Sequence, residues 1–401
     1  MNGAPAVRAG SGRRSGPLRS FDFWFDFSCP YAYLASTAVE ALAARARVEL
    51  VLEPMLLGGV FRAWGTPQSL SSVLEADEQA YAEVDRRRYA ALFGVPLEVP
   101  PQHPIRSVEA LRILLASPRD RWLPLLHAFF RAYWVEGRSI AKEEVGRQIL
   151  ESLGLPAAEI LERSRDSAIK SELRRRTDRA IELGIFGAPS FLVGADLFWG
   201  QDRLAHVEQA LSGADVVSGP EPRVDDGGTA ELFVDPADPF GRVALREVDR
   251  LGIPARIRAV PLPRRRDNAA KERFRRADLL RQSRELGVEV DWERFDAPES
   301  LRASALALAS RDRSEAARKL LLAKSSELSS PALVSKLLGV ELSQAAIAAP
   351  LVTELVARAR SLGVFASPTL VIQQDGITSI YAGADRFFFA RRALLGDSSA
   401  R

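Results

Sequence analysis

The sequence predicts an α/β protein of two domains, in each of which a helical insertion separates a β-α-β half from a β-β-α half. The chain has 401 residues, which is too long for one ordinary domain. Its apolar spacing switches between strand and helix periods, and motifs near its start recur near its end. We expect a flexible tail at 1–19, domains at 20–212 and 230–395, and a linker at 213–229 rich in Gly, Pro and Asp.

The first domain opens with a β-α-β unit. Phenylalanine stands at every second position of residues 21–27, the period of a strand with one apolar face. From Tyr31 the spacing becomes helical for about four turns, and Pro30 suits the first helical position. Residues 48–52 are apolar enough for a second strand.

A helical region and a strand hairpin follow. Segments with helical spacing between Gly or Pro breaks lie at 81–93, 108–116, 122–135, 142–153 and 157–183. Strands are predicted at 190–193 and 197–199, and a last helix at 201–211. This order of elements is typical of a thioredoxin-like domain.

The end of the chain repeats this pattern. Three late segments align without gaps, in the same order, on three early ones: 232–240 on 23–31, 363–371 on 184–192, and 382–387 on 199–204. Asp238 falls where the first copy has Cys29. A carboxylate cannot act as a thiol nucleophile, so we expect the second copy to be chemically degenerate.

Composition excludes several classes of function. Four arginines and no acid lie in residues 1–20, so the rest of the chain carries about −1 against a total of +3, and we expect no nucleic-acid partner. No apolar run is long enough to cross a membrane, and no export signal is evident. His103, His127 and His206 lie far apart, so no metal site is expected. The single cysteine allows no intrachain disulfide and favours a cytoplasmic location.

Cys29 is the candidate catalytic residue. It stands where the first strand ends and the first helix begins, directly before Pro30. The partial positive charge of a helix N-terminus stabilises a thiolate, so we expect a depressed pKa. The alternative is a small buried apolar side chain. Ser28 is a neighbouring hydroxyl at the strand end.

Two further segments suggest a binding site for a small peptide. Pro189 enters a strand, and a cis bond after Ala188 would leave backbone groups free to pair with an extended peptide such as glutathione. Asp202 and Arg203 begin the last helix of the first domain, where they can bind the charged groups of a γ-glutamyl moiety. The alternatives are an ordinary trans proline and a simple helix cap.

Four motifs, at 25–35, 56–65, 186–191 and 198–204, resemble those of 2-hydroxychromene-2-carboxylate isomerases and kappa-class glutathione transferases, in the DsbA-like branch of thioredoxin folds. The resemblance is strong over 20–212 and weak over 230–395. It implies bound glutathione, with Cys29 in place of the serine that contacts the glutathione sulfur. It further implies glutathione contacts from Ser28, Arg62, Thr66, Ala188, Pro189, Gln201, Asp202 and Arg203. Arg62 and Thr66 replace the family's lysine and asparagine.

Three functions follow from this resemblance. The first is a glutathione-dependent isomerase or transferase that acts on an electrophilic aromatic-degradation intermediate, with Tyr31, Trp64 and Trp199 as walls of the substrate site. The second is a monothiol disulfide oxidoreductase that uses Cys29, because the second thiol position holds Ala32. The third is a non-catalytic glutathione- or peptide-binding protein. In each case the two copies can mimic a homodimer within one chain.

Overall fold

The computed structural model describes residues 20–68, 74–213, 220–224, 229–262, 267–290, 292, 300–328 and 330–401. The predicted tail at 1–19 lies outside the described residues, and so does much of the predicted linker at 213–229. The described part of that linker packs on the second half: Val224 is buried, and its N–H donates to the carbonyl of Gly252 at 2.9 Å.

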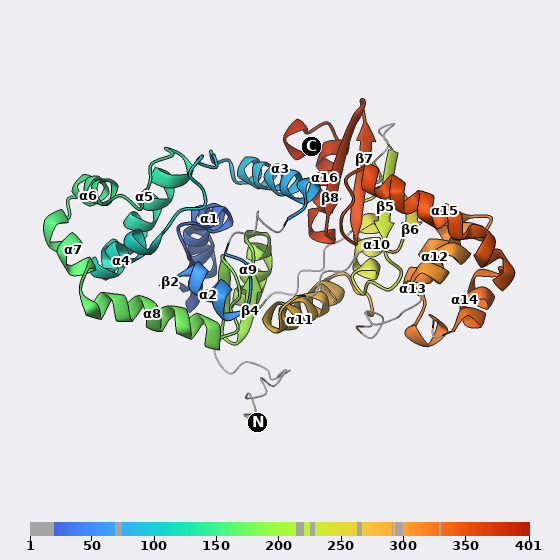
Figure 1. Cartoon of the computed structure of the whole chain (residues 1–401), viewed down its shortest axis with the longest axis horizontal. Helices are drawn as coiled ribbons and strands as arrows, with labels where there is room; N and C mark the ends of the chain where they lie inside the picture. The colour runs from blue at the N-terminus through green and yellow to red at the C-terminus, as the bar shows by residue number, and fades with distance from the viewer. Residues whose placement is uncertain are drawn as a thin grey trace, which may run out of the picture.

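The first half contains one mixed sheet and nine helices among its described residues (Figure 1). Its strands are β1 (Ser20–Phe25), β2 (Glu49–Pro54), β3 (Ser190–Val193) and β4 (Asp196–Trp199). Its helices are α1 (Pro30–Ala46), α2 (Leu57–Ala63), α3 (Ala76–Phe93), α4 (Val108–Ala116), α5 (Trp122–Trp134), α6 (Glu143–Ser152), α7 (Ala157–Ser164), α8 (Ser167–Glu182) and α9 (Leu204–Ser212). Short 3-10 turns lie at η2 (Arg119–Arg121) and η3 (Gln201–Arg203).

The described part of the second half has the same plan. Its strands are β5 (Thr229–Val234), β6 (Ala255–Ala259), β7 (Thr369–Gln374) and β8 (Ile377–Ala382). Its helices are α10 (Gly241–Arg250), α11 (Ala269–Glu285), α12 (Ser300–Ala309), α13 (Arg313–Leu322), α14 (Pro331–Leu338), α15 (Leu342–Ser361) and α16 (Phe387–Leu394). Short 3-10 turns lie at η5 (Ser325–Leu328), η6 (Ala384–Arg386) and η7 (Ser398–Ala400).

The two sheets have the same strand order. Within the described residues they run β2-β1-β3-β4 and β6-β5-β7-β8. In each sheet the first two strands along the chain pair in parallel, the third pairs antiparallel with the first, and the fourth pairs antiparallel with the third. The predicted α/β architecture with two thioredoxin-like sheets is therefore confirmed.

Local sequence explains the elements that frame the site. The alternating phenylalanines of β1 are buried, and Phe23 stacks on Phe191 of β3 with ring centroids 5.5 Å apart. Pro30 is the first residue of α1, as expected. One prediction is wrong: residues 157–183 form two helices, because α7 ends before Arg165 and Asp166 is the N-cap of α8.

One helix of each half packs against the sheet of the other half. In Figure 1, α3 runs from the first half to β8 of the second, and α11 lies beside β4 of the first. Nη1 of Arg88, on α3, donates to the Ile380 carbonyl of β8 at 2.9 Å. Nη2 of Arg281, on α11, donates to the Leu197 carbonyl of β4 at 2.8 Å. These matching contacts relate the halves by an approximate two-fold arrangement.

Candidate functional site

The turn after β1 is held by Asp26, which is 1% exposed. Its Oδ1 accepts hydrogen bonds from both the N–H and the hydroxyl of Ser28, each at 2.9 Å, and its Oδ2 accepts one from the N–H of Leu57 at 2.8 Å. Burial raises the pKa of Asp26, and these hydrogen bonds oppose the rise. Ser28 thus supports the turn that presents Cys29, and its contact with glutathione stays a prediction.

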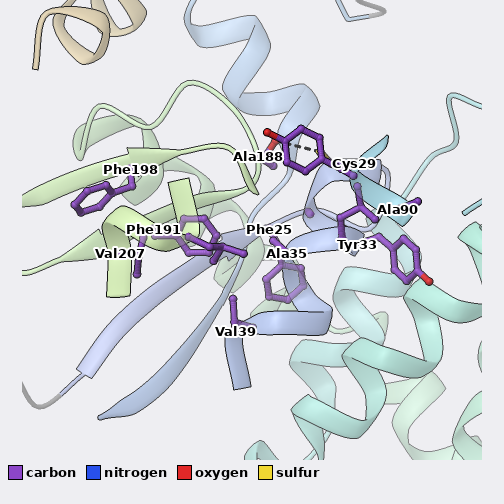
Figure 2. Packing of buried hydrophobic residues seen from close by; sticks show 14 of the residues in the cluster. Phe25, Cys29, Tyr33, Ala35, Val39, Ala90, Ala188, Phe191, Phe198 and Val207 are labelled. Atoms are coloured by element: carbon purple, nitrogen blue, oxygen red, sulfur yellow. Dashed lines mark hydrogen bonds between the residues drawn. The ribbon is translucent and has the colours of Figure 1, made fainter. Parts of the chain in front are cut away.

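Cys29 is the residue that precedes α1, with an extended backbone (φ −100°, ψ 117°). Its S–H donates to the carbonyl of Ala188 at 3.1 Å, so the thiol lies against the loop that precedes β3. Figure 2 shows the two residues side by side above the packed rings of Phe25 and Phe191. The thiol and this loop therefore lie together although they are 159 residues apart in the sequence.

The predicted ionisation of Cys29 is wrong. The residue is only 7% exposed, and burial raises the pKa of its thiol to about 12. Hydrogen bonds from the backbone of Ala32 and Tyr31 favour the thiolate but do not offset burial, and the charge of Asp26 raises the pKa further. Near neutral pH the thiol is protonated, so it can donate a hydrogen bond but is a poor nucleophile.

The proline loops of the two halves are built alike. The Ala188–Pro189 and Ser367–Pro368 bonds are both cis. The carbonyl of each proline accepts a hydrogen bond from a glycine: Gly200 at 3.0 Å and Gly383 at 2.9 Å. Among the described residues, none accepts a hydrogen bond from the N–H of Ala188. This N–H remains available to a bound peptide.

A cavity of about 450 Å³ lies between the two halves. Of the residues predicted for the site, seven line it: Tyr31, Ala188, Pro189, Trp199, Gln201, Asp202 and Arg203. Cys29 itself does not line the cavity, but its sulfur contacts the carbonyl of Ala188, which does. The thiol therefore adjoins the cavity at the proline loop.

Three predicted residues lie elsewhere among the described residues. Arg62 is exposed on α2 and does not line the cavity. Thr66 accepts a long hydrogen bond, at 3.4 Å, from the side-chain amide of Asn268 in the second half. Trp64 donates through Nε1 to the carbonyl of Ile185 at 2.8 Å, and so is a structural contact rather than a cavity wall.

Two buried donors at the cavity have no partner among the described residues. They are Nε2 of Gln201, whose residue is 4% exposed, and Nε1 of Trp199. The indole packs closely on Gly187, where a Cβ atom would lie 2.5 Å from Nε1, so glycine is required there. A buried donor without an acceptor is costly.

Asp202 and Arg203 meet their counterparts in the second half, Asp385 and Arg386. Nη1 of Arg203 lies 3.0 Å from Oδ2 of Asp202 and 2.7 Å from Oδ2 of Asp385. Nη1 of Arg386 lies 2.6 Å from Oδ2 of Asp385 and also contacts Oδ2 of Asp202. Two cations and two carboxylates thus alternate in a closed group, which we call the Asp–Arg ring.

Outer carboxylates complete this arrangement. Asp278, on α11, accepts from Nε and Nη2 of Arg203 at 3.0 and 2.8 Å. Asp85, on α3, pairs with Arg386 in the same way at 3.3 and 3.4 Å. Every nitrogen of the Arg203 guanidinium therefore has a protein partner, and the expectation that it binds a γ-glutamyl carboxylate directly is not supported by the geometry.

The ring is electrostatically asymmetric. Burial raises the pKa of Asp202, and the nearby Asp385 carboxylate adds to the rise despite the arginines. Burial alone would also raise the pKa of Asp385, but Arg386 and Arg203 outweigh it and lower that pKa. The two carboxylates therefore bind protons as an interacting pair rather than independently.

Sequence reasoning missed the contributions of α11 and α3 to the cavity. Lys271 and Phe274 of α11 line it, as do Tyr81 and Asp85 of α3. The spacing of Tyr81 and Asp85 equals that of Phe274 and Asp278, an aromatic residue followed four positions later by aspartate. A comparison of the two insertions for this pattern would have found them.

No single helix in the described part of the chain is long and apolar enough to span a membrane. The pair α14 and α15, which meet at 88°, reaches the required length and composition only together. The described residues contain no group of three or more His, Cys, Asp or Glu side chains suited to a metal ion.

Known proteins resemble about half of this chain. Residues 21–212 match the family model "DSBA-like thioredoxin domain". A 2-hydroxychromene-2-carboxylate isomerase of Pseudomonas putida is 28% identical over 192 residues, which is 47% of this chain and 93% of the relative. Glutathione S-transferase kappa 1 of Caenorhabditis elegans is 26% identical over 223 residues, 52% of this chain and 95% of the relative. A solved 2-hydroxychromene-2-carboxylate isomerase gives a TM-score of 0.44 at 26% identity, covering 48% of this chain and 95% of that structure.

Proposed function

We propose, on the premise that residues 21–212 form a DSBA-like thioredoxin domain, that this protein is a glutathione-dependent isomerase or transferase. The substrate would be an electrophile such as an aromatic-degradation intermediate. The observation that carries the proposal is the protonated Cys29 thiol, 3.1 Å from the Ala188 carbonyl at the peptide-binding loop. Similarity to isomerases and kappa transferases over about half of the chain supports it.

In this proposal glutathione extends along Ala188, whose N–H is available for pairing. The Cys29 S–H then turns from the Ala188 carbonyl toward the glutathione sulfur and stabilises it as a thiolate. The N-terminus of α1 adds favourable electrostatics, because its first amides are directed at this point. The glutathione sulfur, not Cys29, is the nucleophile.

The glutathione thiolate adds to an unsaturated carbon of the electrophile, and the displaced electron pair is stabilised on a conjugated carbonyl oxygen. For isomerisation, a bond of the adduct rotates and elimination restores both the double bond and the thiolate. For conjugation, the carbanion takes up a proton and the adduct is released. Tyr31 and Trp199, which line the cavity, are the proposed walls for the electrophile.

Disulfide exchange by Cys29 itself is disfavoured, because a pKa of about 12 leaves almost no thiolate to attack. We further propose that residues 230–395 are a degenerate copy of 20–212, joined by a linker at 213–229, and that the two form a dimer-like unit. The shared sheet order and the helices that pack against the opposite sheets support this. The proposal includes a cytoplasmic location.

The test is turnover of aromatic-pathway electrophiles with and without glutathione. Cys29→Ser keeps a hydrogen-bond donor, so it should keep at least about a tenth of the activity, whereas Cys29→Ala should lose about a hundredfold or more. Activity that does not need glutathione, or equal activity in the two variants, would contradict the proposal. A stable Cys29–glutathione disulfide during turnover would instead favour exchange chemistry.

A further inference from the structure

Tyr31 stands in the first turn of α1, two residues after Cys29, and lines the cavity. Its side chain is partly buried, yet its hydroxyl has no hydrogen-bond partner among the described residues. The hydroxyl is also not enclosed by the protein, in contrast to that of Tyr89. A partly buried tyrosine hydroxyl usually has a protein partner. Tyr31 therefore offers an unused hydrogen-bond donor to a molecule in the cavity.

The neighbouring helix α3 brings a cation close to this hydroxyl. α3 packs against α1, and the charge of Arg86 lowers the pKa of Tyr31. Within the described part of the chain Arg86 has no ion pair, and its Nε is buried without an acceptor. Burial, with the charges of Asp85 and Cys29, raises the pKa of Tyr31 by more than Arg86 and Arg386 lower it. The hydroxyl therefore keeps its proton near neutral pH and can donate it to a hydrogen bond.

The second half lacks both groups. The gapless alignment of 232–240 on 23–31 places Phe240, which also lines the cavity, at the position of Tyr31. Aligning α11 on α3 through their aromatic and aspartate residues places Leu279, which is buried, at the position of Arg86. Apolar side chains thus satisfy the packing at both places in the half without the thiol. The hydroxyl and its cation occur only in the half that carries Cys29.

We propose that Tyr31 is a catalytic residue whose hydroxyl donates a hydrogen bond to the carbonyl oxygen of an α,β-unsaturated ketone or aldehyde, with Arg86 as a supporting cation. The inference rests on the proposed function and names the substrate class of that site. The reaction needs such a donor, because addition of a thiolate to the double bond places negative charge on the carbonyl oxygen.

In the addition step a C–S bond forms at the β carbon, the double bond shifts toward the carbonyl carbon, and the carbonyl π pair moves onto oxygen. The Tyr31 O–H keeps its proton and stabilises that oxygen, and the positive charge of Arg86 adds to the effect. For isomerisation the electron pair returns from the oxygen after bond rotation, the C–S bond breaks, and the sulfur leaves as thiolate. For conjugation the α carbon takes a proton from water.

Two probe electrophiles test this role on the full chain with glutathione. One is benzylideneacetone, an unsaturated ketone. The other is benzyl chloride, in which the thiolate displaces chloride and no oxyanion forms. Tyr31→Phe should lower kcat for the ketone about a hundredfold and change kcat for benzyl chloride less than about threefold. The fold should accept this variant, because the second half has Phe240 at the corresponding place.

Matched variants make the result specific. Tyr33→Phe is the control for Tyr31, because the Tyr33 hydroxyl donates to the Pro96 carbonyl at 2.8 Å and does not line the cavity. Arg86→Gln should lower kcat for the ketone about tenfold, and Arg86→Lys should recover most of it. Arg87→Gln, which removes an exposed pair with Glu83 on the same helix, should behave as the wild type.

A measurement without turnover reports the hydrogen bond directly. Benzylacetone is the saturated ketone and cannot add a thiolate. Its carbonyl stretch, followed by infrared difference spectroscopy, should fall in frequency on binding to the wild type and to Tyr33→Phe. The stretch should not change on binding to Tyr31→Phe. A frequency that is the same in all three proteins would overturn the assignment of Tyr31.

The failures of the two proposals can be told apart. If glutathione accelerates both probes but Tyr31→Phe equals the wild type, or slows both probes equally, the assignment of Tyr31 is wrong and the proposed function stands. If glutathione accelerates neither probe while the carbonyl stretch still depends on Tyr31, the donor stands and the proposed function fails. Absence of both effects contradicts both proposals.

Discussion

Arg203 and Asp278 form a two-point ion pair, with Nε 3.0 Å from Oδ1 and Nη2 2.8 Å from Oδ2, although they are 75 residues apart. Its counterpart joins Arg386 to Asp85 across 301 residues. Both pairs link a helix of one half to the 3-10 turn beside the proline loop of the other. The cavity is therefore shaped by contacts between the halves.

Removal of Arg203 should be strongly destabilising. In Arg203→Met the carboxylates of Asp278 and Asp385 lose a buried cation, and an uncompensated buried charge costs about 3–5 kcal/mol. The free energy of unfolding in urea measures this. Arg318→Met is the control, because its pair with Asp249 is partly exposed at 2.8 Å and should cost less than about 1 kcal/mol. Equal losses would mean that the Asp–Arg ring contributes no more than a surface pair.

Gly200→Ala should disrupt the same region. Gly200 has φ 103°, which an alanine rarely adopts, and an added Cβ atom would collide with Oδ1 of Asp202. Gly94→Ala is the matched control, since Gly94 has φ 67° and open space around it. We expect Gly200→Ala to lower the free energy of unfolding by at least about 1 kcal/mol more than the control does. Equal effects would show that backbone strain alone, not the contact with Asp202, accounts for the loss.

Cys29 should react slowly with alkylating reagents. At pH 8 a thiol of pKa about 12 has far less thiolate than an ordinary cysteine, so iodoacetamide should modify the folded protein at least about a hundredfold more slowly than the unfolded chain. Because this is the only cysteine of the sequence, total thiol loss reports it directly. Equal rates would place the thiol in a more open setting.

The Cys29 thiol should also make the free energy of unfolding depend on pH in the alkaline range. The pKa of this thiol is higher in the folded protein than in the unfolded chain. The stabilisation that the buried, protonated thiol provides is therefore complete below the unfolded pKa of about 8.5 and is lost as pH rises from there toward about 12. Over this window the free energy of unfolding should fall by about 1.4 kcal/mol per pH unit more in the wild type than in Cys29→Ser. Parallel pH profiles for the two proteins would mean that burial does not perturb the thiol.

Local sequence patterns predicted helices and strands correctly where a single residue type marks the element. The alternating phenylalanines gave β1 its period, and Pro30 marked the first turn of α1. The two helices α7 and α8 were predicted as one because Asp166, the N-cap of α8, lies within an unbroken helical spacing. A polar residue inside such a spacing is a weak signal, since many helices tolerate it.

The site was predicted only in part, because its chemistry depends on distant contacts. The proline loop and Cys29 were identified from their motifs, but the motif alone gave the wrong direction for the pKa of Cys29. A helix N-terminus is visible in sequence, whereas the packing that buries the sulfur is not. Likewise the partners of Arg203 come from the second half, and a local pattern does not reveal them.

The most direct test of the central claim is ultraviolet absorbance of the glutathione thiolate, titrated with pH in the presence of the wild type, Cys29→Ser and Cys29→Ala. Bound glutathione should ionise at least about one pH unit below the free thiol in the wild type and in Cys29→Ser, and should lose this shift in Cys29→Ala. An absence of binding, or the same thiolate signal in Cys29→Ala as in the wild type, would contradict the account.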